Sequence, residues 1–319
     1  EVESLFRIIA TLRERGVAVV YITHRMDEVF RIAQRITVLR DGRHVGEFPA
    51  DALDEARLIA LMVGRELSAV FPPIEAAPGK VALSVRGLTR AGAFRDVSFD
   101  VRQGEVVGVA GLMGAGRTEV VSSLFGLAPA DCGKVEVFGR PVRIRRPADA
   151  IRLGIGMVSE DRKTFGLVPE MSVRQNISLA SLNACCRGPL LRHAREAEMV
   201  AECMREFAVR AADGRQPVRQ LSGGNQQKVV IARTLLAQPS IVLLDEPTRG
   251  IDVGAKIEIY GIIARLAREG KAVLLVSSDL PEVMSLSHRV LVMRQGAIAA
   301  ELDPARTSQE EVLRYAMPV

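Results

Sequence analysis

Two kinds of segment alternate along most of the chain. Continuous apolar runs at 105–111 (EVVGVAG), 240–246 (SIVLLDE) and 272–278 (AVLLVSS) are typical of strands buried on both faces. Each run is followed by apolar residues at helical spacing, and the helix after the first run is expected to begin at Arg117. This alternation predicts an α/β fold with a mostly parallel sheet that helices cover on both faces.

The start of the chain is repeated near its end. Residues 8–23 (IIATLRERGVAVVYIT) align without a gap with 262–277 (IIARLAREGKAVLLVS), a spacing of 254 residues that also brings 35–42 (RITVLRDG) onto 289–296 (RVLVMRQG). Solenoid repeats have periods of only about 20–50 residues. The spacing therefore predicts two domains in tandem.

A linker separates the two copies. Residues 71–80 (FPPIEAAPGK) hold three prolines and a glycine between two periodic stretches. We expect residues 1–70 to be the tail of a first domain and 81–319 to be a complete second one. Because the chain opens at Glu1 inside a helical pattern without a methionine, we also expect it to be a fragment.

Composition narrows the class of protein. With 48% hydrophobic and 25% charged residues, the chain is expected to be globular, and its apolar runs stop short of the roughly 18 residues of a membrane helix. The net charge of +5 is spread along the chain, which favours a solvated surface over contact with nucleic acid or lipid. Four cysteines, at 132, 185, 186 and 203, lack metal-binding spacing and are expected to be reduced. No secretion signal opens the chain.

The stretch 111–118 (GLMGAGRT) has the form of a P-loop and lies between a predicted strand and a predicted helix. Glycines let successive backbone N–H groups point at a phosphate, and the helix N-terminus adds positive potential there. Thr118 is placed to bind Mg²⁺ through its hydroxyl. Arg117 stands where the motif usually has lysine, and its planar guanidinium does not replace an ammonium without consequence. The alternative is a glycine-rich turn without a ligand.

Residues 241–248 (IVLLDEPT) form an apolar run that ends in two carboxylates. Adjacent strand residues point to opposite sides, so Asp245 and Glu246 can have different tasks. Asp245 can hold the water shell of Mg²⁺, and Glu246 can polarise an attacking water. Together the two motifs predict nucleotide binding.

Residues 221–239 (LSGGNQQKVVIARTLLAQP) begin with a serine and two glycines ahead of an amphipathic helix. This arrangement predicts a second group of N–H donors at a helix N-terminus. Since one P-loop needs only one such site, we expect these donors to reach a nucleotide that another domain holds.

The segments LSGGNQQK and LLDEPTRGIDVGAK resemble the signature and Walker B region of ATP-binding cassette (ABC) transporters. GLMGAGRTE and 158–179 (VSEDRKTFGLVPEMSVRQNISL) resemble the second cassette of double-cassette importers for ribose, galactose and xylose. The resemblance covers essentially the whole chain. It implies an ABC ATPase fold of the P-loop NTPase class, with a mixed sheet core, an N-terminal antiparallel β-subdomain and a helical subdomain at about 165–215.

The resemblance also implies a mechanism and partners. Two cassettes pack head to tail around two ATP molecules with Mg²⁺, and each site combines the P-loop of one cassette with the LSGG of the other. The missing half of the first cassette would thus complete the ATP sites. The subunit would lie on the cytoplasmic face of the bacterial inner membrane. It would bind transmembrane permease subunits through Ser159–Asp161 and the helical subdomain, and a periplasmic sugar-binding protein would act through the permease, with no nucleic acid involved.

The site residues follow from the same resemblance. Catalytic roles fall on Glu246, Ser278 and His24, and the Mg²⁺ ligands would be Thr118, Asp245 and Glu160. Nucleotide contacts are expected from Gly111, Leu112, Met113, Gly114, Ala115, Gly116, Arg117, Thr118, Glu119, Leu221, Ser222, Gly223, Gly224 and Asn225. An adenine-stacking role for Phe94, the one nearby aromatic, is no better supported than a role in the core.

Three residues depart from the family pattern. Besides Arg117, Glu160 stands where glutamine is usual, and Ser278 stands where the switch histidine belongs, although His24 occupies that place in the first copy. His24 and the LSGG segment would both serve the first-cassette site. We therefore hypothesise that the first-cassette site hydrolyses ATP efficiently and that the site of this cassette mainly binds it.

Other functions stay open at this point. A nucleoside importer shares LSGGNQQK. A soluble cassette protein acting on ribosomes or DNA would need a basic arm or a long charged insertion, and the ten-residue linker speaks against it. A non-catalytic regulatory module is kept open by the three substitutions.

Overall fold

The computed structural model describes residues 2–23, 26–40, 42–63, 71–188 and 190–318. The chain divides into two compact units, residues 1–70 with 252–254, and residues 71–251 with 255–319. Each unit is described below by itself.

Unit 1 is built around the two-stranded antiparallel sheet of β1 (Arg35–Arg40) and β2 (Arg43–Pro49). Its helices are α1 (Val2–Glu14), α2 (Met26–Ile32), the 3-10 turn η1 (Ala50–Ala52) and α3 (Glu55–Val63). Because strand side chains alternate between faces, Ile36 and Val38 lie on the same side of β1, where both are buried with Leu58 of α3.

The main sheet of unit 2 has six strands in the order β14-β13-β5-β12-β11-β8. Five strands run parallel, and β14 pairs antiparallel with β13. Their bounds are β5 (Val106–Gly111), β8 (Ile155–Val158), β11 (Ile241–Asp245), β12 (Ala272–Val276), β13 (Arg289–Arg294) and β14 (Ala297–Leu302). Buried β-branched and leucine side chains fill both faces of the inner strands, so the predicted α/β architecture is confirmed.

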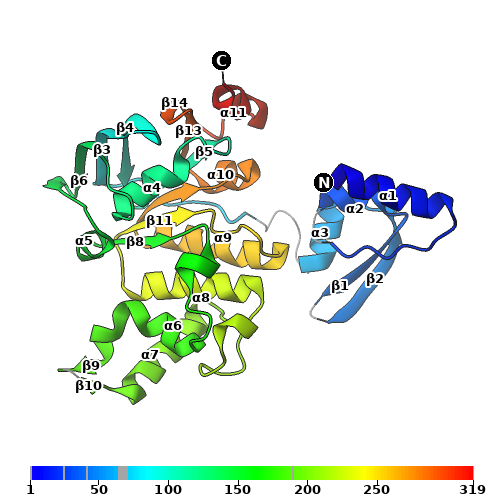
Figure 1. The fold of residues 1–319 in the computed structure, drawn as a ribbon, viewed down its shortest axis with the longest axis horizontal. Helices are drawn as coiled ribbons and strands as arrows, with labels where there is room; N and C mark the ends of the chain where they lie inside the picture. Colours follow the sequence, from blue (N-terminus) through cyan, green and yellow to red (C-terminus); the bar gives the residue numbers. More distant parts are fainter. Residues whose placement is uncertain (1, 24–25, 41, 64–70, 189, 319) are drawn as a thin grey trace. The chain divides into compact units, whose positions relative to one another are not determined.

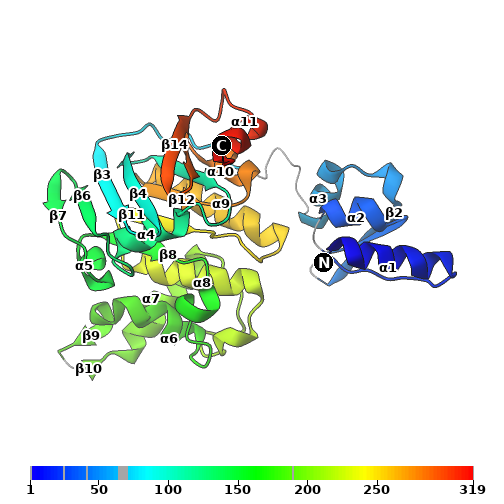
Figure 2. The same ribbon diagram turned by 45° about the horizontal axis from the view of Figure 1, so that its top comes forward.

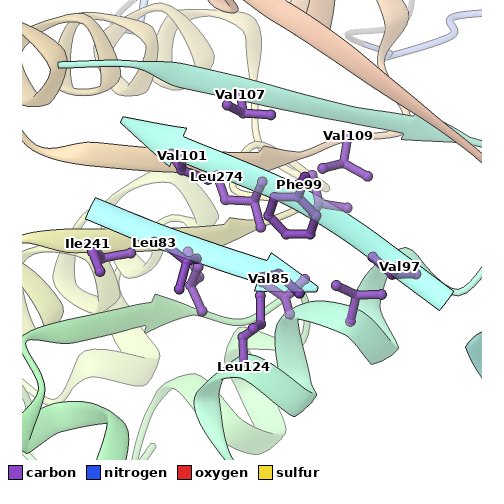
Figure 3. Close-up of a cluster of buried hydrophobic side chains, with 14 of the residues drawn as sticks. Leu83, Val85, Val97, Phe99, Val101, Val107, Val109, Leu124, Ile241 and Leu274 are labelled. Carbon is purple, nitrogen blue, oxygen red and sulfur yellow. The ribbon is translucent and has the colours of Figure 1, made fainter. Parts of the chain in front are cut away.

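A second sheet has the antiparallel order β4-β3-β6-β7. It consists of β3 (Val81–Arg90), β4 (Phe94–Arg102), β6 (Cys132–Val137) and β7 (Arg140–Val142). Figure 3 shows the apolar core between this sheet, the main sheet and α4 (Arg117–Phe125), with Phe99, Leu124 and Leu274 among its side chains. Phe94 is 3% exposed and belongs to this core, so its own ring is not available for stacking on an adenine.

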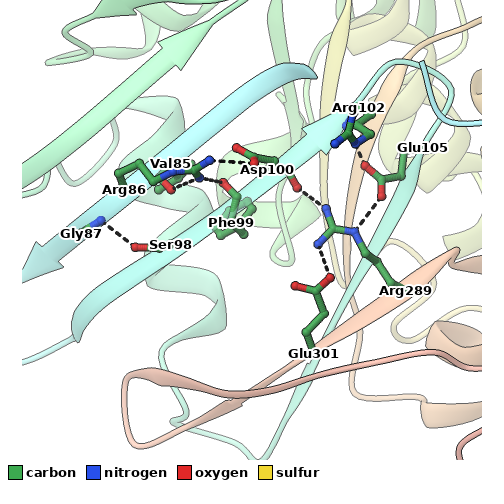
Figure 4. Close-up of polar contacts among 10 residues, drawn as sticks. All are labelled: Val85, Arg86, Gly87, Ser98, Phe99, Asp100, Arg102, Glu105, Arg289 and Glu301. Atoms are coloured by element: carbon green, nitrogen blue, oxygen red, sulfur yellow. Dashed lines mark hydrogen bonds and ion pairs between the residues drawn. The ribbon is translucent and has the colours of Figure 1, made fainter. Parts of the chain in front are cut away.

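Arg289 joins the two sheets at one edge (Figure 4). Its Nε donates to Glu105 Oε1 at 2.7 Å, its Nη1 donates to Glu301 Oε1 at 2.9 Å, and its Nη2 donates to the Asp100 carbonyl of β4. Glu105 is 3% exposed, so its charge depends on this partner. The guanidinium thereby fixes the antiparallel sheet against β13.

Along the chain, the remaining helices of unit 2 fall mostly between the strands of the main sheet or after its last strand. They are α5 (Pro147–Arg152), η3 (Arg162–Gly166), α6 (Val173–Ser178), η4 (Leu179–Cys185), α7 (His193–Glu206), η5 (Val218–Gln220), α8 (Gly223–Leu236), α9 (Val253–Arg268), α10 (Leu280–Leu286) and α11 (Gln309–Ala316). Both ribbon views place α6, α7 and α8 together with the short β9 (Cys186–Arg187) and β10 (Leu190–Leu191), away from β3, β4 and β6 (Figures 1 and 2).

The two units repeat the same order of elements. Shifting α2 and β1 by 254 residues gives the bounds of α10 and β13, and the same shift brings β2 onto β14 and α3 onto α11 within one residue at each end. The repeat also preserves an ion pair, since Arg35 meets Glu47 at 2.8 Å as Arg289 meets Glu301 at 2.9 Å.

One segment of the repeat differs between the units. Residues 272–276 form β12, whereas residues 18–22 form no strand, and Val20 and Ile22 are 90% and 93% exposed. β12 is paired on both sides, by β11 and β5. Among the described residues of unit 1 no strand pairs with 18–22, so this apolar segment lacks the neighbours that make β12 a strand.

Candidate functional site

The P-loop residues form the turn between β5 and α4. Gly114 and Gly116 have φ of 80° and 95°, a left-handed region that favours glycine. A Cβ on Gly116 would lie 2.9 Å from the Ala93 carbonyl oxygen, and one on Gly111 would lie 2.5 Å from that of Met293. These glycines therefore allow the backbone to turn tightly beneath the N-terminus of α4, where free N–H groups favour an anion.

Asp245 ends β11 directly behind the P-loop helix. Thr118 Oγ1 donates to Asp245 Oδ1 at 3.1 Å, and Asp245 is 1% exposed. Burial raises the pKa of Asp245 to about 6, against the hydrogen bond from Thr118, which lowers it. Its second oxygen, Oδ2, is buried and has no hydrogen-bond partner in the part of the chain that the structure describes.

Glu246 has φ of 47°, which turns its side chain away from the strand pattern. One carboxylate oxygen lies 3.6 Å from Arg117 Nη2, and the other accepts a hydrogen bond of 2.9 Å from Ser278 Oγ. Arg117 also donates through Nη1 to the Ser277 carbonyl at 2.8 Å. The structure thus brings Glu246 and Ser278, two of the residues expected to be catalytic, together with Arg117, which is expected to contact the nucleotide.

A cleft of about 490 Å³ opens above the P-loop, within the usual range for small-molecule sites. Glu160 lies on its wall and makes an ion pair with Arg249. The lining residues are Gly111, Leu112, Met113, Gly114, Ala115, Gly116, Arg117, Thr118, Glu119, Glu160, Glu246, Arg249, Ser278, Leu280, Val312, Leu313 and Ala316. All nine predicted P-loop contacts are therefore on one wall of a single cleft.

The residues 221–225 lie elsewhere. Ser222 caps α8 by accepting a hydrogen bond from the Asn225 N–H at 3.4 Å, and Asn225 Nδ2 donates to the same oxygen at 3.0 Å. All five residues are described, and none of them lines the cleft. Within the protein, the Leu221 N–H donates to the Val218 carbonyl and the Asn225 N–H to Ser222 Oγ, so a ligand outside this cleft would meet the N–H groups of Ser222, Gly223 and Gly224.

The oxygen atoms beside the P-loop are of the type that binds Mg²⁺. The partnerless Asp245 Oδ2 and the Thr118 hydroxyl beside it are hard oxygen donors of the type that the ion prefers. No group of three or more His, Cys, Asp or Glu side chains forms a preformed metal cage among the described residues. Such a sparse set fits an ion that takes most of its ligands from phosphates and water. Glu160 forms an ion pair with Arg249, and its side chain would need to turn away from Arg249 to bind the ion.

Sequence reasoning missed two parts of the site. Arg249, within the segment LLDEPTRGIDVGAK, and the α11 residues Val312, Leu313 and Ala316 line the cleft, although none of them is among the predicted site residues. Behind Glu246, the Thr248 hydroxyl donates to Glu282 on α10, a fully buried carboxyl whose pKa burial raises to about 7. His24 lies outside the described residues.

Comparison with known proteins decides the family. The model of the ABC transporter family matches residues 94–249. The chain is 50% identical over 318 residues to the putative ribose/galactose/methyl galactoside import ATP-binding protein 3 of Burkholderia ambifaria, covering 99% of the chain and 62% of that protein. Residues 94–249 belong to the ABC transporter family. The chain is also 48% identical, over 319 residues, to the ribose import ATP-binding protein RbsA 3 of Rubrobacter xylanophilus, with 100% of the chain and 64% of that protein covered.

Solved structures share the fold of the cassette. A nucleotide-free ATP-binding cassette from an ABC transporter has a TM-score of 0.59 at 24% identity and covers 74% of this chain and 94% of its own. The structure of cbiO1 from Clostridium perfringens has a TM-score of 0.62 at 23% identity and covers 74% of this chain and 94% of its own. The chain spans about 62–64% of the length of the curated relatives named above. None of its helices in the described ranges has the length and apolar composition needed to cross a bilayer.

Proposed function

We propose that this chain belongs to the ATP-binding and hydrolysing subunit that drives import of a monosaccharide across the bacterial inner membrane. The observation that carries the proposal is the cleft of about 490 Å³ lined by the whole P-loop together with Glu246 and Ser278. The choice of a sugar is supported by relatives of 48–50% identity that are named as ribose or ribose/galactose/methyl galactoside import proteins.

Nucleotide binding follows from the P-loop. The N–H groups of residues 112–118 and the α4 N-terminus would hold the phosphates, and the strained glycines keep side chains out of that space. Leu280 and the α11 residues Leu313 and Ala316 line the same cleft and offer apolar surface for the rest of the nucleotide. The cleft thus combines an anion site with an apolar wall.

Mg²⁺ would be held by Thr118 and Asp245, with Glu160 joining after release from Arg249. When bound, the ion neutralises negative charge on the phosphates. Asp245 is well suited to this task because its buried carboxylate carries an ionisation cost that a nearby cation would offset.

Residues 221–225 would complete the ATP site of a first cassette. Ser222 Oγ accepts two hydrogen bonds from Asn225, so its hydroxyl hydrogen is the part that a phosphate oxygen can accept. The first two N–H groups of α8 lie beside it. In the same way, a first-cassette signature would complete the cleft described here.

The two ATP sites would hydrolyse ATP at different rates. A general base must be able to accept a proton from water, but both oxygens of Glu246 are engaged, one near the Arg117 guanidinium and one by Ser278. Serine supplies neither the reach nor the charge of the histidine at the matching position of unit 1. This site would therefore mainly bind ATP, while the first-cassette site hydrolyses it.

The partners would be those of an importer. Permease subunits would contact the loop Ser159–Asp161 and the helices α6 and α7, and a periplasmic sugar-binding protein would deliver the sugar to the permease. The location would be the cytoplasmic face of the inner membrane.

The test compares two variants of the full-length protein assembled with its permease. We expect Glu246→Gln to leave most ATP turnover intact, whereas substitution of the corresponding first-cassette glutamate abolishes it. If Glu246→Gln alone abolishes transport-coupled turnover, the proposed inequality of the sites is wrong. The chain alone is expected to show negligible turnover, because neither site is complete in it; robust turnover by its monomer would contradict this.

A further inference from the structure

Lys228 is one of the largest fully buried side chains of the protein, at 2% exposure. Lysine is rarely buried completely unless it is paired, since removing an unpaired ammonium from water is strongly unfavourable. Its Nζ donates to Glu258 Oε2 on α9 at 2.7 Å and to the Ala208 carbonyl. Two acceptors on different segments therefore fix this one cation.

The Ala208 carbonyl belongs to a strained turn after α7. Ala208 has φ of 48°, a left-handed conformation that is unfavourable for a residue with a Cβ. The charged hydrogen bond from Lys228 stabilises this turn. Two residues later, the Arg210 N–H donates to Asn225 Oδ1 at 2.8 Å. Hydrogen bonds to the segment 208–210 thus connect Lys228 with Asn225 in the first turn of α8.

Asn225 completes the connection to the signature segment. Its amide nitrogen donates to Ser222 Oγ at 3.0 Å, while its amide oxygen is held by Arg210. Asn225 and Lys228 are three residues apart on α8 and so face the same side of the helix. Both side chains form hydrogen bonds with the segment 208–210 from that side, so a displacement of this segment would affect both of them.

Glu258 closes the network. Its second oxygen lies 3.4 Å from Arg210 Nη2, so one carboxylate holds both Lys228 and Arg210. In unit 1 the position 254 residues earlier is Ser4, so the repeat does not preserve this carboxylate. The network is therefore a property of the second copy.

We propose that Lys228 and Glu258 are positioning residues that fix Ser222 and Asn225, and hence the signature N–H donors, against α9. The inference rests on the proposed function, in which these donors reach the ATP of the first cassette. Neither Lys228 nor Glu258 lines the cleft of this cassette. Their replacement should therefore lower turnover at the first-cassette site without changing ATP binding in this cleft.

A role in folding alone makes a different prediction. Lys228→Met removes one partner of the pair, but the Glu258 carboxylate left behind is 35% exposed and lies 3.4 Å from Arg210 Nη2, so water and Arg210 offset its charge. Lys228→Met should then leave a stable protein with unchanged turnover. A positioning role instead predicts lost turnover in a protein that still unfolds near the wild-type temperature, because a misplacement of about 1 Å can cost up to about 100-fold in rate.

The experiment uses the full-length protein assembled with its permease. Lys228→Met is expected to lower kcat about 10- to 100-fold, with the affinity of a fluorescent ATP analogue for the cleft of this chain within about threefold of wild type. Lys228→Arg, which keeps the charge, should retain at least about a third of the turnover. Lys134→Met, on the exposed strand β6, is the matched control and should match wild type.

A second variant keeps the inference testable if Lys228→Met does not fold. Glu258→Gln keeps an amide oxygen that can accept a hydrogen bond from the buried Lys228 ammonium but removes the charge that holds it, and it should lower kcat in the same direction. Wild-type kcat in folded Lys228→Met or Glu258→Gln would overturn the inference, as would equal losses in Lys228→Met and Lys228→Arg. Absence of ATP turnover in the wild-type assembly would instead contradict the proposed function.

Discussion

Replacing Asp245 by asparagine should stabilise the cassette at neutral pH. Burial raises the pKa of Asp245 from 3.8 to about 6, so keeping it ionised in the folded state opposes folding. The difference of about 2.2, at 1.36 kcal/mol for each pH unit, gives a gain of up to roughly 3 kcal/mol for a neutral isostere. Asparagine can still accept the hydrogen bond of Thr118 at the same oxygen position.

The sign of the pH dependence follows from the raised pKa. Protonated Asp245 favours the folded state, so its contribution is fully present below pH 3.8, the unfolded value, and is lost as pH rises through about 6. The advantage of Asp245→Asn should therefore be largest above pH 7 and should shrink toward zero near pH 4. Asparagine should also remove the effect of Mg²⁺ on ATP affinity, since a neutral amide is a poorer ligand.

Urea unfolding of the two proteins at pH 7.5, 6 and 4.5, without nucleotide, measures this effect. Asp51→Asn, at an exposed position of unit 1, is the matched control and should change stability by less than about 0.5 kcal/mol at every pH. If Asp245→Asn gives no gain at pH 7.5, or a gain that does not change with pH, the carboxylate does not carry the proposed ionisation cost.

Three further substitutions test other parts of the structure. Arg289→Met should lower the free energy of unfolding by about 3–5 kcal/mol, because it leaves the buried charge of Glu105 unpaired. The control Arg306→Met, at a side chain that is 87% exposed, should have little effect, and equal melting temperatures of the two variants would refute the prediction. Gly116→Ala should cost about 1–2 kcal/mol and weaken ATP binding, since φ is 95° there, and unchanged ATP affinity would speak against the P-loop geometry. Ser278→His should raise ATP hydrolysis several-fold in full-length protein whose first-cassette glutamate has been replaced, and an unaltered rate would show that the missing histidine does not limit this site.

The parts of the fold that depend on local sequence could be predicted. The run 105–111 became β5 (Val106–Gly111), and the helix expected from Arg117 begins there, because apolar periodicity and glycine spacing report local structure directly. The mixed sheet core and the antiparallel subdomain came from the family resemblance, and both are confirmed. The spacing of 254 residues reappears in the bounds of the helices and strands.

The contacts that tune the site could not be predicted. Glu160 is held by Arg249, 89 positions away, and Lys228 is held by Glu258 on another helix. Such pairs depend on how the helices and loops pack, and a charged residue in a helical pattern is more often solvated than buried. The sequence therefore marks which groups can act in the site, while packing decides which of them are already engaged.

The proposed nucleotide site can be examined by equilibrium binding of ATP to this chain, with and without Mg²⁺. We expect saturable binding of one nucleotide per chain, tightened by Mg²⁺, with negligible hydrolysis and with the Mg²⁺ effect lost in Thr118→Ala. No saturable binding at millimolar ATP, or binding in which Thr118→Ala keeps the full Mg²⁺ effect, would contradict the proposed site.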